Sequence, residues 1–167
     1  MSGILVAGIG NIFQGDDGFG VEVAQHLSRA ELPPDVTVVD FGIRGIDLTY
    51  ALMDAYDAVV LVDAAARGDV PGTLSLIEPE AARASPLESG EVMLSAHDLD
   101  PAKVMQLIGT LGGGCGRVLL VACEPLDCGG EDGRIGLSAP VAAAIGPAIA
   151  MIRSLVAELR LSPAQAA

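Results

Sequence analysis

Carboxylates and one histidine stand where this chain could do chemistry. Asp16 and Asp17 follow a glycine-rich turn, Asp63 ends an apolar run, and His97 lies in a polar stretch. Two carboxylates and one imidazole supply oxygen and nitrogen ligands with positions left open, a set that suits a borderline divalent ion such as nickel or zinc. Asp17, Asp63 and His97 therefore form a candidate metal site. Each also has an ordinary alternative role, as a helix cap, a turn acid and a loop histidine.

The elements that must position these residues alternate between strand and helix. Four apolar runs predict buried strands, at residues 4–7, 36–39, 58–62 and 118–122. Helices are predicted after Gly18, from Ile46 to Met53, after Pro101, and from Leu137 to about Leu159 with a kink near Pro147. The run 73–77 suits an antiparallel or edge strand, and residues 78–91 read as a loop.

This alternation predicts an α/β fold: a three-layer domain with a twisted, mostly parallel five-stranded sheet between helices. The carboxyl ends of parallel strands share one edge of the sheet, where ligands bind. The acids that follow strands, Asp17, Asp40, Asp63 and Glu124, are therefore expected to converge there, with His97 able to join them. We expect one domain over residues 1–161 and a frayed tail over 162–167.

Composition limits the partners. The chain has 167 residues, 51% hydrophobic, and carries 22 acidic against nine basic residues for a net charge of -13. Without a basic stripe, nucleic acid and anionic membrane surfaces are unlikely partners. The densest apolar stretch, 141–152, is shorter than the roughly 20 residues of a membrane span, and no export signal is visible. We expect a soluble cytoplasmic protein whose three cysteines are free thiols.

Three other chemistries fit less well. Gly8 and Gly10 begin a dinucleotide fingerprint, with Asp40 at the place of a ribose-binding acid. Phe13 replaces the third glycine, however, and Asp16 and Asp17 would repel a pyrophosphate. A serine or cysteine nucleophile lacks its usual motif, and His26 is expected on a helix surface. A zinc site from Cys123, Cys128 and His97 lacks the usual cysteine spacing.

Short motifs in order along the chain give a resemblance to a known family. They are Gly8-Ile-Gly-Asn11, Asp16-Asp-Gly-Phe-Gly20, Asp40-Phe-Gly-Ile-Arg-Gly45, Val62-Asp-Ala64, Ser95-Ala-His97, Glu124-Pro125 and Ile135-Gly-Leu-Ser138. With them the chain resembles the hydrogenase maturation endopeptidases, which trim the C-terminal extension from the large subunit of nickel-iron hydrogenases. The resemblance implies a five-stranded twisted sheet between helices, in agreement with the pattern above.

The resemblance also implies roles for individual residues. Asp17, Asp63 and His97 match the family's metal ligands, and Asp17 or Asp63 would act on the attacking water. Many members have glutamate at the first ligand position, and Asp17 is shorter than glutamate by one methylene. Asp16 is therefore a possible substitute ligand, and it is also a candidate substrate contact. Asp40 matches a further acid near the site, with a role in substrate contact or catalysis.

The implied partner is a hydrogenase large-subunit precursor, and the implied cofactor is nickel that the precursor brings, with zinc or cadmium as possible substitutes in vitro. A site that borrows its metal from the substrate could not cut a nickel-free precursor. Two alternatives stay open: a non-catalytic, nickel-sensing maturation chaperone, and a nucleotide-binding α/β domain.

Overall fold

The computed structural model describes residues 3–78, 101–110 and 115–162. Five strands form its sheet: β1 (Ile4–Ile9), β2 (Val36–Gly42), β3 (Ala58–Ala64), β4 (Leu74–Ile77) and β5 (Arg117–Cys123). Its helices are the 3-10 turn η1 (Gly15–Gly18), α1 (Phe19–Leu27), α2 (Gly45–Met53), α3 (Pro101–Thr110) and α4 (Ala139–Leu161). His97, Asp100 and the glycines at 112–114 lie outside the described residues, as does the tail from 163.

The sheet has the strand order β2-β1-β3-β5-β4. The first four strands in this order pair in parallel, and β4 pairs antiparallel with β5 at the edge. The predicted mostly parallel sheet and the antiparallel edge strand are thus both confirmed. β2 and β3 extend further than the apolar runs suggested, so that Asp40 and Asp63 lie within the last residues of their strands rather than after them.

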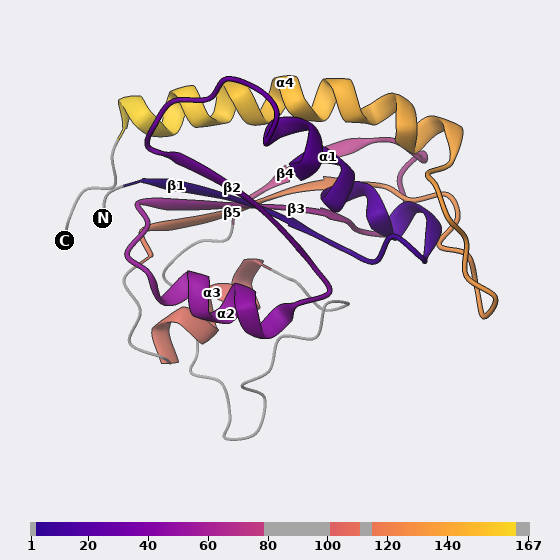
Figure 1. Ribbon diagram of the computed structural model, residues 1–167, viewed down its shortest axis with the longest axis horizontal. Coiled ribbons are helices and arrows are strands. Elements are labelled where there is room, and N and C mark those ends of the chain that lie inside the picture. The colour runs from indigo at the N-terminus through magenta and orange to yellow at the C-terminus, as the bar shows by residue number, and fades with distance from the viewer. Residues whose placement is uncertain (1–2, 79–100, 111–114, 163–167) are drawn as a thin grey trace.

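Helices cover both faces of the sheet, α1 and α4 on one side and α2 and α3 on the other (Figure 1). Side chains alternate between the two faces along each strand, because successive residues of a strand point in opposite directions. On β1, for example, Ile4 and Val6 pack toward α1 and α4, whereas Leu5 and Ala7 pack on the opposite side. Both faces are therefore apolar, which explains why these strands read as continuous hydrophobic runs.

Helix α1 rests directly on the sheet through two glycines. A Cβ atom on Gly20 would lie 2.0 Å from the carbonyl oxygen of Val62, and one on Gly8 would lie 2.4 Å from the carbonyl oxygen of Gly20. Both distances are far below van der Waals contact, so no side chain fits at either position. These glycines therefore bring the start of α1, and the acidic turn before it, close to the ends of β1 and β3.

Helix α4 is one element of 23 residues that contains Pro147, and it confirms the helical region predicted from Leu137 to about Leu159. By length and mean hydropathy, 1.6 over its most apolar window, it could cross a membrane, a test that core helices also pass. One side of α4 is buried against the sheet and α1, including Val141, Ala148 and Ile152. About a third of the apolar window, 33%, is buried, as in a helix that covers a sheet with one side.

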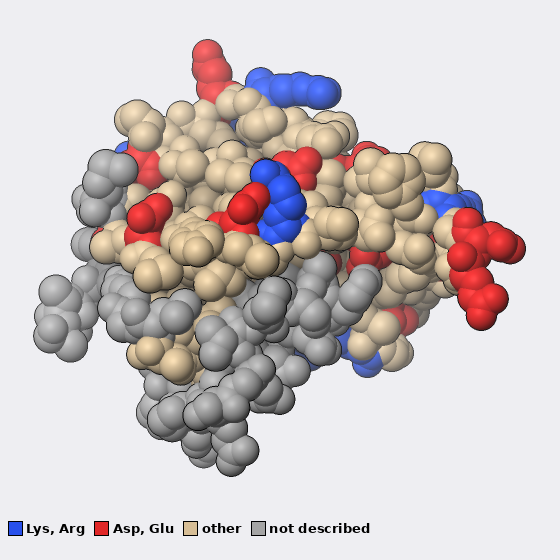
Figure 2. Space-filling model, turned by 60° about the horizontal axis from the view of Figure 1, so that its bottom comes forward, with Lys and Arg blue, Asp and Glu red and all other residues tan. Residues whose placement is uncertain are grey.

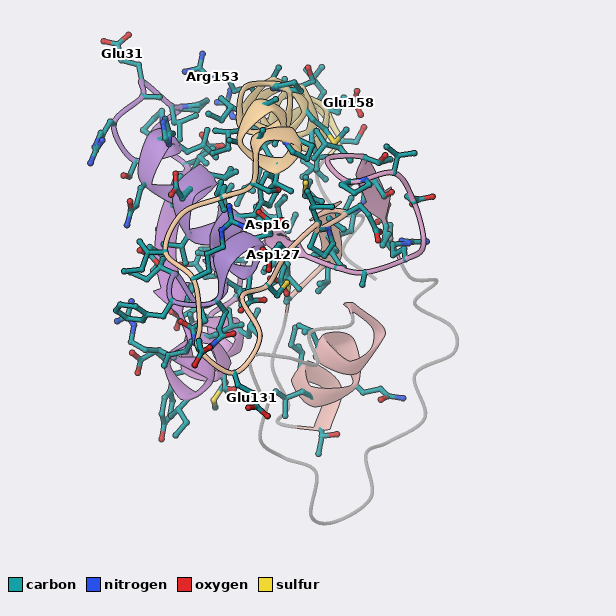
Figure 3. The ribbon with its side chains drawn as sticks, turned by 90° about the vertical axis from the view of Figure 1, so that its right-hand side faces the viewer. Asp16, Glu31, Asp127, Glu131, Arg153 and Glu158 are labelled. Atoms are coloured by element: carbon teal, nitrogen blue, oxygen red, sulfur yellow. The ribbon has the colours of Figure 1, made fainter. Side chains whose placement is uncertain are left out.

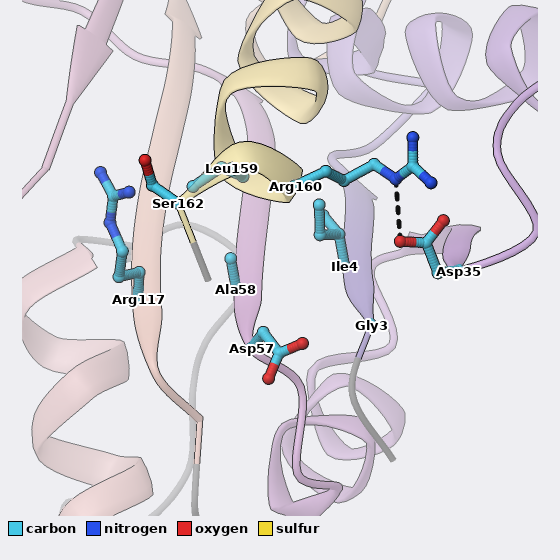
Figure 4. A pocket seen from close by; sticks show the side chains of 9 residues that line it. All are labelled: Gly3, Ile4, Asp35, Asp57, Ala58, Arg117, Leu159, Arg160 and Ser162. Carbon is cyan, nitrogen blue, oxygen red and sulfur yellow. Dashed lines mark hydrogen bonds and ion pairs between the residues drawn. The ribbon is translucent and has the colours of Figure 1, made fainter. Parts of the chain in front are cut away.

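The amino ends of the strands meet the last turn of α4 around a small cavity of about 70 Å³ (Figure 4). The two arginines that line it are already paired. Arg160 donates to Asp35 at 2.9 Å, and Arg117 forms two hydrogen bonds with Glu78. Ion pairs between surface groups thus close this end of the sheet. The candidate metal-binding and catalytic acids lie at the opposite end.

Candidate functional site

The candidate site lies where the chain leaves two adjacent parallel strands in opposite directions. After β1 the chain turns through η1 and α1 toward β2, and after β3 it continues toward β4 and β5 on the other side. In doubly wound folds a crevice opens at such a point, beyond the carboxyl ends of the strands. Asp17, in η1, and Asp63, in β3, stand there.

The glycine turn before Asp17 closes upon its own backbone. Gly10 has a φ of 139°, and a Cβ atom there would lie 1.8 Å from the carbonyl oxygen of Asp17. The Asn11 N–H donates to Asp17 Oδ2 at 2.9 Å. Asp17 is half-buried and fixed by this bond. The backbone of the acidic turn therefore fills the space beside Gly10. The glycine turn holds the Asp17 carboxylate at the edge of the sheet.

Asp63 is a buried carboxylate beside a second carboxylate. Only 7% of it is exposed. Burial, and after it the charge of Asp17, raise the pKa of Asp63 to about 8, although the Ala64 N–H, which donates to Asp63 Oδ1 at 2.9 Å, acts to lower it. The effect of the Asp17 charge on Asp63 indicates that the two acids lie near each other, at the edge of the sheet where they were expected to converge. Such a pair is poised to accept a cation, because a cation favours the charged form of both acids.

The third predicted ligand, His97, lies outside the described residues. Within the described part of the chain, no group of three histidine, cysteine, aspartate or glutamate side chains could hold a metal ion. Asp17 and Asp63 thus supply two carboxylates of the predicted set, and carboxylate oxygens suit divalent cations.

Asp16 has a different role from the one expected from the sequence. It is fully buried. Its Oδ2 accepts hydrogen bonds from the Leu126 and Asp127 N–H groups and the Ser138 hydroxyl, each at 2.8 Å, and its Oδ1 accepts from the Ser138 N–H at 2.7 Å. Burial alone would raise the pKa of Asp16, but these bonds outweigh it and hold the pKa below its usual value. The interpretation of Asp16 as a substitute ligand or substrate contact is corrected, since its oxygens are occupied and shielded.

Asp16 fastens the loop between β5 and α4 to the acidic turn. Figure 3 shows Asp16 next to Asp127 of this loop. Backbone bonds strengthen this attachment: Gly15 N–H donates to the Arg134 oxygen at 2.7 Å, Asp16 N–H to the Asp127 oxygen at 2.9 Å, and Arg134 N–H to the Phe13 oxygen at 2.9 Å. We call this set of bonds between the acidic turn and residues 126–138 the clamp. The sequence did not predict it, and its one sign in the sequence was the motif that ends at Ser138. The clamp determines where Asp17 lies.

Asp40 lines a groove of about 320 Å³ between the turn that follows β1, helix α1 and the end of β2 with the turn after it. Its carboxylate accepts a hydrogen bond from Gln25 Nε2 at 3.3 Å, and its main-chain oxygen accepts one from Arg44. Asn11, which holds Asp17, also lines the groove. Asn11 thus connects the groove with Asp17, although neither Asp17 nor Asp63 lines it, and the position of Asp40 in the groove is compatible with substrate contact.

Glu124 directly follows β5, and its carboxylate is already bonded. It is 8% exposed, and its carboxylate accepts hydrogen bonds from the backbone N–H groups of Arg67, at 2.7 Å, and Gly68, at 3.3 Å. These bonds hold the connection after β3 against the end of β5. Glu124 therefore lies at the predicted edge of the sheet, and its carboxylate secures a loop.

The cysteines and His26 offer no nucleophile. All three cysteines are free, as predicted, and Cys123 is buried while Cys128 is exposed. Burial raises the pKa of Cys123 to about 11, and burial with the charges of Asp17 and Asp16 raises that of Cys128, so both thiols stay protonated at neutral pH. His26 is exposed on α1, as expected, with Nδ1 2.8 Å from the Glu22 oxygen.

Comparison with known proteins identifies similar chains. The model of a family described as "Hydrogenase maturation protease" matches residues 21–155. The hydrogenase expression/formation protein HupD of Rhizobium leguminosarum bv. viciae is 35% identical over 156 residues, 90% of this chain and 74% of that protein. The solved hydrogenase maturating endopeptidase HybD from E. coli is 27% identical, with a TM-score of 0.70 over 96% of this chain and 93% of that one. A hydrogenase 2 maturation peptidase from Thaumarchaeota archaeon SCGC_AB-539-E09 is 28% identical, with a TM-score of 0.69 over 93% of this chain and 98% of that one.

Proposed function

The chain belongs to the hydrogenase maturation protease family, and from this membership we propose that it removes the C-terminal extension of a nickel-iron hydrogenase large-subunit precursor after nickel insertion. Proteases of this kind are hydrolases that cut a peptide bond. The family thus supplies the reaction type, and the residues at the carboxyl edge of the sheet supply candidates for its chemistry.

The observation that carries the proposal is the buried Asp63 beside Asp17 at the crevice of the sheet. A buried carboxylate next to a second carboxylate is costly unless a cation compensates it. Structural acids in this chain, such as Asp16 and Glu124, are instead satisfied by several N–H donors. Asp63 accepts one hydrogen bond among the described residues, which leaves it available to a ligand.

We assign the nickel to the substrate, as an ion that the precursor carries into the crevice. Asp17 and Asp63 would hold it, with His97 as the proposed third ligand, and the ion would polarise the carbonyl of the bond to be cut. Either carboxylate can take the proton of the attacking water. Asp40, which lines the groove, is proposed to contact the substrate. Zinc or cadmium would bind the same oxygen and nitrogen donors in vitro.

We propose that the protein acts in the cytoplasm. Three free thiols and no disulfide fit a reducing compartment. The net charge of -13 gives no reason to expect nucleic acid as a partner.

The test is the mass of a purified nickel-loaded precursor before and after incubation with the protein. Wild type should shorten the nickel-loaded precursor and leave the nickel-free one intact, whereas Asp17→Asn and Asp63→Asn should slow cleavage by about 10²-fold or more. Asp132→Asn, an exposed acid of the β5–α4 loop, is the matched control and should cut at the wild-type rate. Unchanged precursor mass with wild type, despite tight binding, would support the chaperone instead. Equal cutting of both precursors would refute the dependence on nickel.

A further inference from the structure

Helix α2 carries apolar side chains on two opposite sides. Leu48 and Leu52, each 1% exposed, pack into the core. A second set faces solvent, and we call it the α2 strip: Ile43, just before the helix, is 62% exposed, Ile46 is 56%, Tyr50 is 67% and Met53 is 46%. Within the helix, spacings of four and three residues place Ile46, Tyr50 and Met53 along one side, and Ile43 precedes them in the chain.

This exposure needs a reason, since a helix of nine residues requires only one apolar side to pack on a sheet. Single exposed apolar residues are normal on protein surfaces, but a row of four large ones marks an interaction site. Tyrosine and methionine are also enriched in protein interfaces. The α2 strip thus has the composition of a docking surface.

The strip continues from the candidate site. Ile43 lines the groove that holds Asp40, and Phe13, 61% exposed, lines the same groove near the acidic turn. An occupant of the groove would therefore extend onto the α2 strip. Figure 2 shows this side of the molecule, where uncharged side chains form broad areas between separate charged ones.

The charge around the strip indicates what kind of partner it fits. Residues 40–54 contain the acids Asp40, Asp47 and Asp54 and one base, Arg44, which gives 1 - 3 = -2. Arg44 is itself engaged, since its Nη1 lies 3.2 Å from Asp47 Oδ2 and its Nε donates to the Phe41 oxygen. No free cation lies in this segment. A complementary partner surface is apolar in the centre with lysine or arginine at its rim.

We propose that the α2 strip is an exosite: it docks a folded surface of the precursor, apolar and rimmed by cationic side chains, at a distance from the bond that is cut. This inference rests on the proposed function, which supplies a macromolecular substrate. Docking at a second place holds the precursor while the groove receives the segment to be cut. The strip contributes binding energy and takes no part in the chemistry.

The test compares two double variants in the binding of a nickel-loaded precursor and in its cleavage. Ile46→Ser/Tyr50→Ser removes the centre of the strip. Val70→Ser/Leu161→Ser removes apolar side chains that are 75% and 85% exposed elsewhere, as the control. We expect the strip variant to raise KM by about tenfold or more with kcat unchanged, as loss of central interface residues does, and the control to match wild type.

Binding separates this inference from the proposed function. In the Asp63→Asn background, Kd for the precursor should rise about tenfold with the strip variant and stay constant with the control. An unchanged Kd overturns the exosite even where cleavage is normal, whereas a raised Kd supports it even where wild type cuts nothing and the proposed function fails. A second outcome also overturns the exosite: wild type sediments as a dimer, the strip variant sediments as a monomer, and Kd for the precursor is the same for both.

Discussion

The adjacent acids Asp16 and Asp17 should respond to the same substitution in opposite ways. Asp16→Asn replaces one carboxylate oxygen by an amide nitrogen in a fully buried place. Three donors point at Oδ2 and the Ser138 N–H points at Oδ1, so in either orientation the new N–H₂ group meets at least one donor. The variant loses a hydrogen bond and the charge that strengthened the others.

The magnitude follows from these contacts. A buried donor left without a partner costs about 1–3 kcal/mol, and hydrogen bonds to charged groups contribute about 1.5–3 kcal/mol. We therefore expect Asp16→Asn to lower the free energy of unfolding by about 3 kcal/mol. For a chain of this size each kcal/mol shifts Tm by about 2–4 °C, so Tm should fall by about 6–12 °C.

Asp17→Asn is the matched control. The asparagine keeps an oxygen for the Asn11 N–H, and its neutral side chain no longer repels Asp63. Its Tm should equal or exceed that of wild type. Calorimetry or circular dichroism of both variants at pH 7 measures the difference. An Asp16→Asn Tm within about 2 °C of wild type, below what one lost buried hydrogen bond predicts, would refute the structural role of Asp16.

Further predictions concern pH and packing. The fold lowers the pKa of Asp16, so this acid stabilises the protein above pH 3.8, its pKa in the unfolded chain, and the stabilisation is lost as pH falls below that value. The difference in Tm between wild type and Asp16→Asn should therefore become smaller in acid. The pKa of Asp63 is raised from 3.8 to about 8, so wild type loses stability as pH rises through this range, by about 1.4 kcal/mol per pH unit. Urea unfolding of metal-free protein should show Asp63→Asn gaining on wild type by up to about 4 kcal/mol between pH 4 and 7, and parallel pH curves would contradict the raised pKa. Gly20→Ala forces a Cβ to 2.0 Å from the Val62 oxygen and should cost about 3 kcal/mol in the same assay, whereas Gly146→Ala, exposed in α4, should stabilise by about 0.5–1 kcal/mol.

Much of the fold was predictable because its signals are local. Each parallel strand is covered on both faces, so it appears in the sequence as an unbroken apolar run. The strand ends were less visible, since Asp40 and Asp63 read as turn residues but pair with Gly8 and Ala122 inside the sheet. A polar residue at the end of a buried strand has the composition of a turn, and only the hydrogen-bonded ladder distinguishes the two.

The site was only partly predictable because roles depend on distant partners. Asp16 and Asp17 have the same side chain in the same acidic turn, but the donors that make Asp16 structural come from residues 110 to 122 positions later. Glu124 likewise takes its partners from the loop after β3, 56 and 57 residues earlier. Periodicity and turn chemistry say nothing about such contacts. The strand alternation alone was enough to bring Asp17 and Asp63 to the same edge.

The two acids of the turn also explain how the chain can keep a costly carboxylate at its site. Asp63 is buried beside Asp17, and because its pKa is raised to about 8 the metal-free fold loses stability as pH rises toward neutral. Asp16, whose charge is satisfied by four donors, stabilises the fold in that same range of pH and fastens the loop that holds the turn. Because Asp16 directly precedes Asp17, the bonds of Asp16 also hold in place the carboxylate that lies beside Asp63 of β3. Loss of this support should be most damaging near neutral pH, where Asp63 has already lowered the stability of the fold. Adding Asp63→Asn to Asp16→Asn should therefore recover much of the stability that Asp16→Asn alone loses.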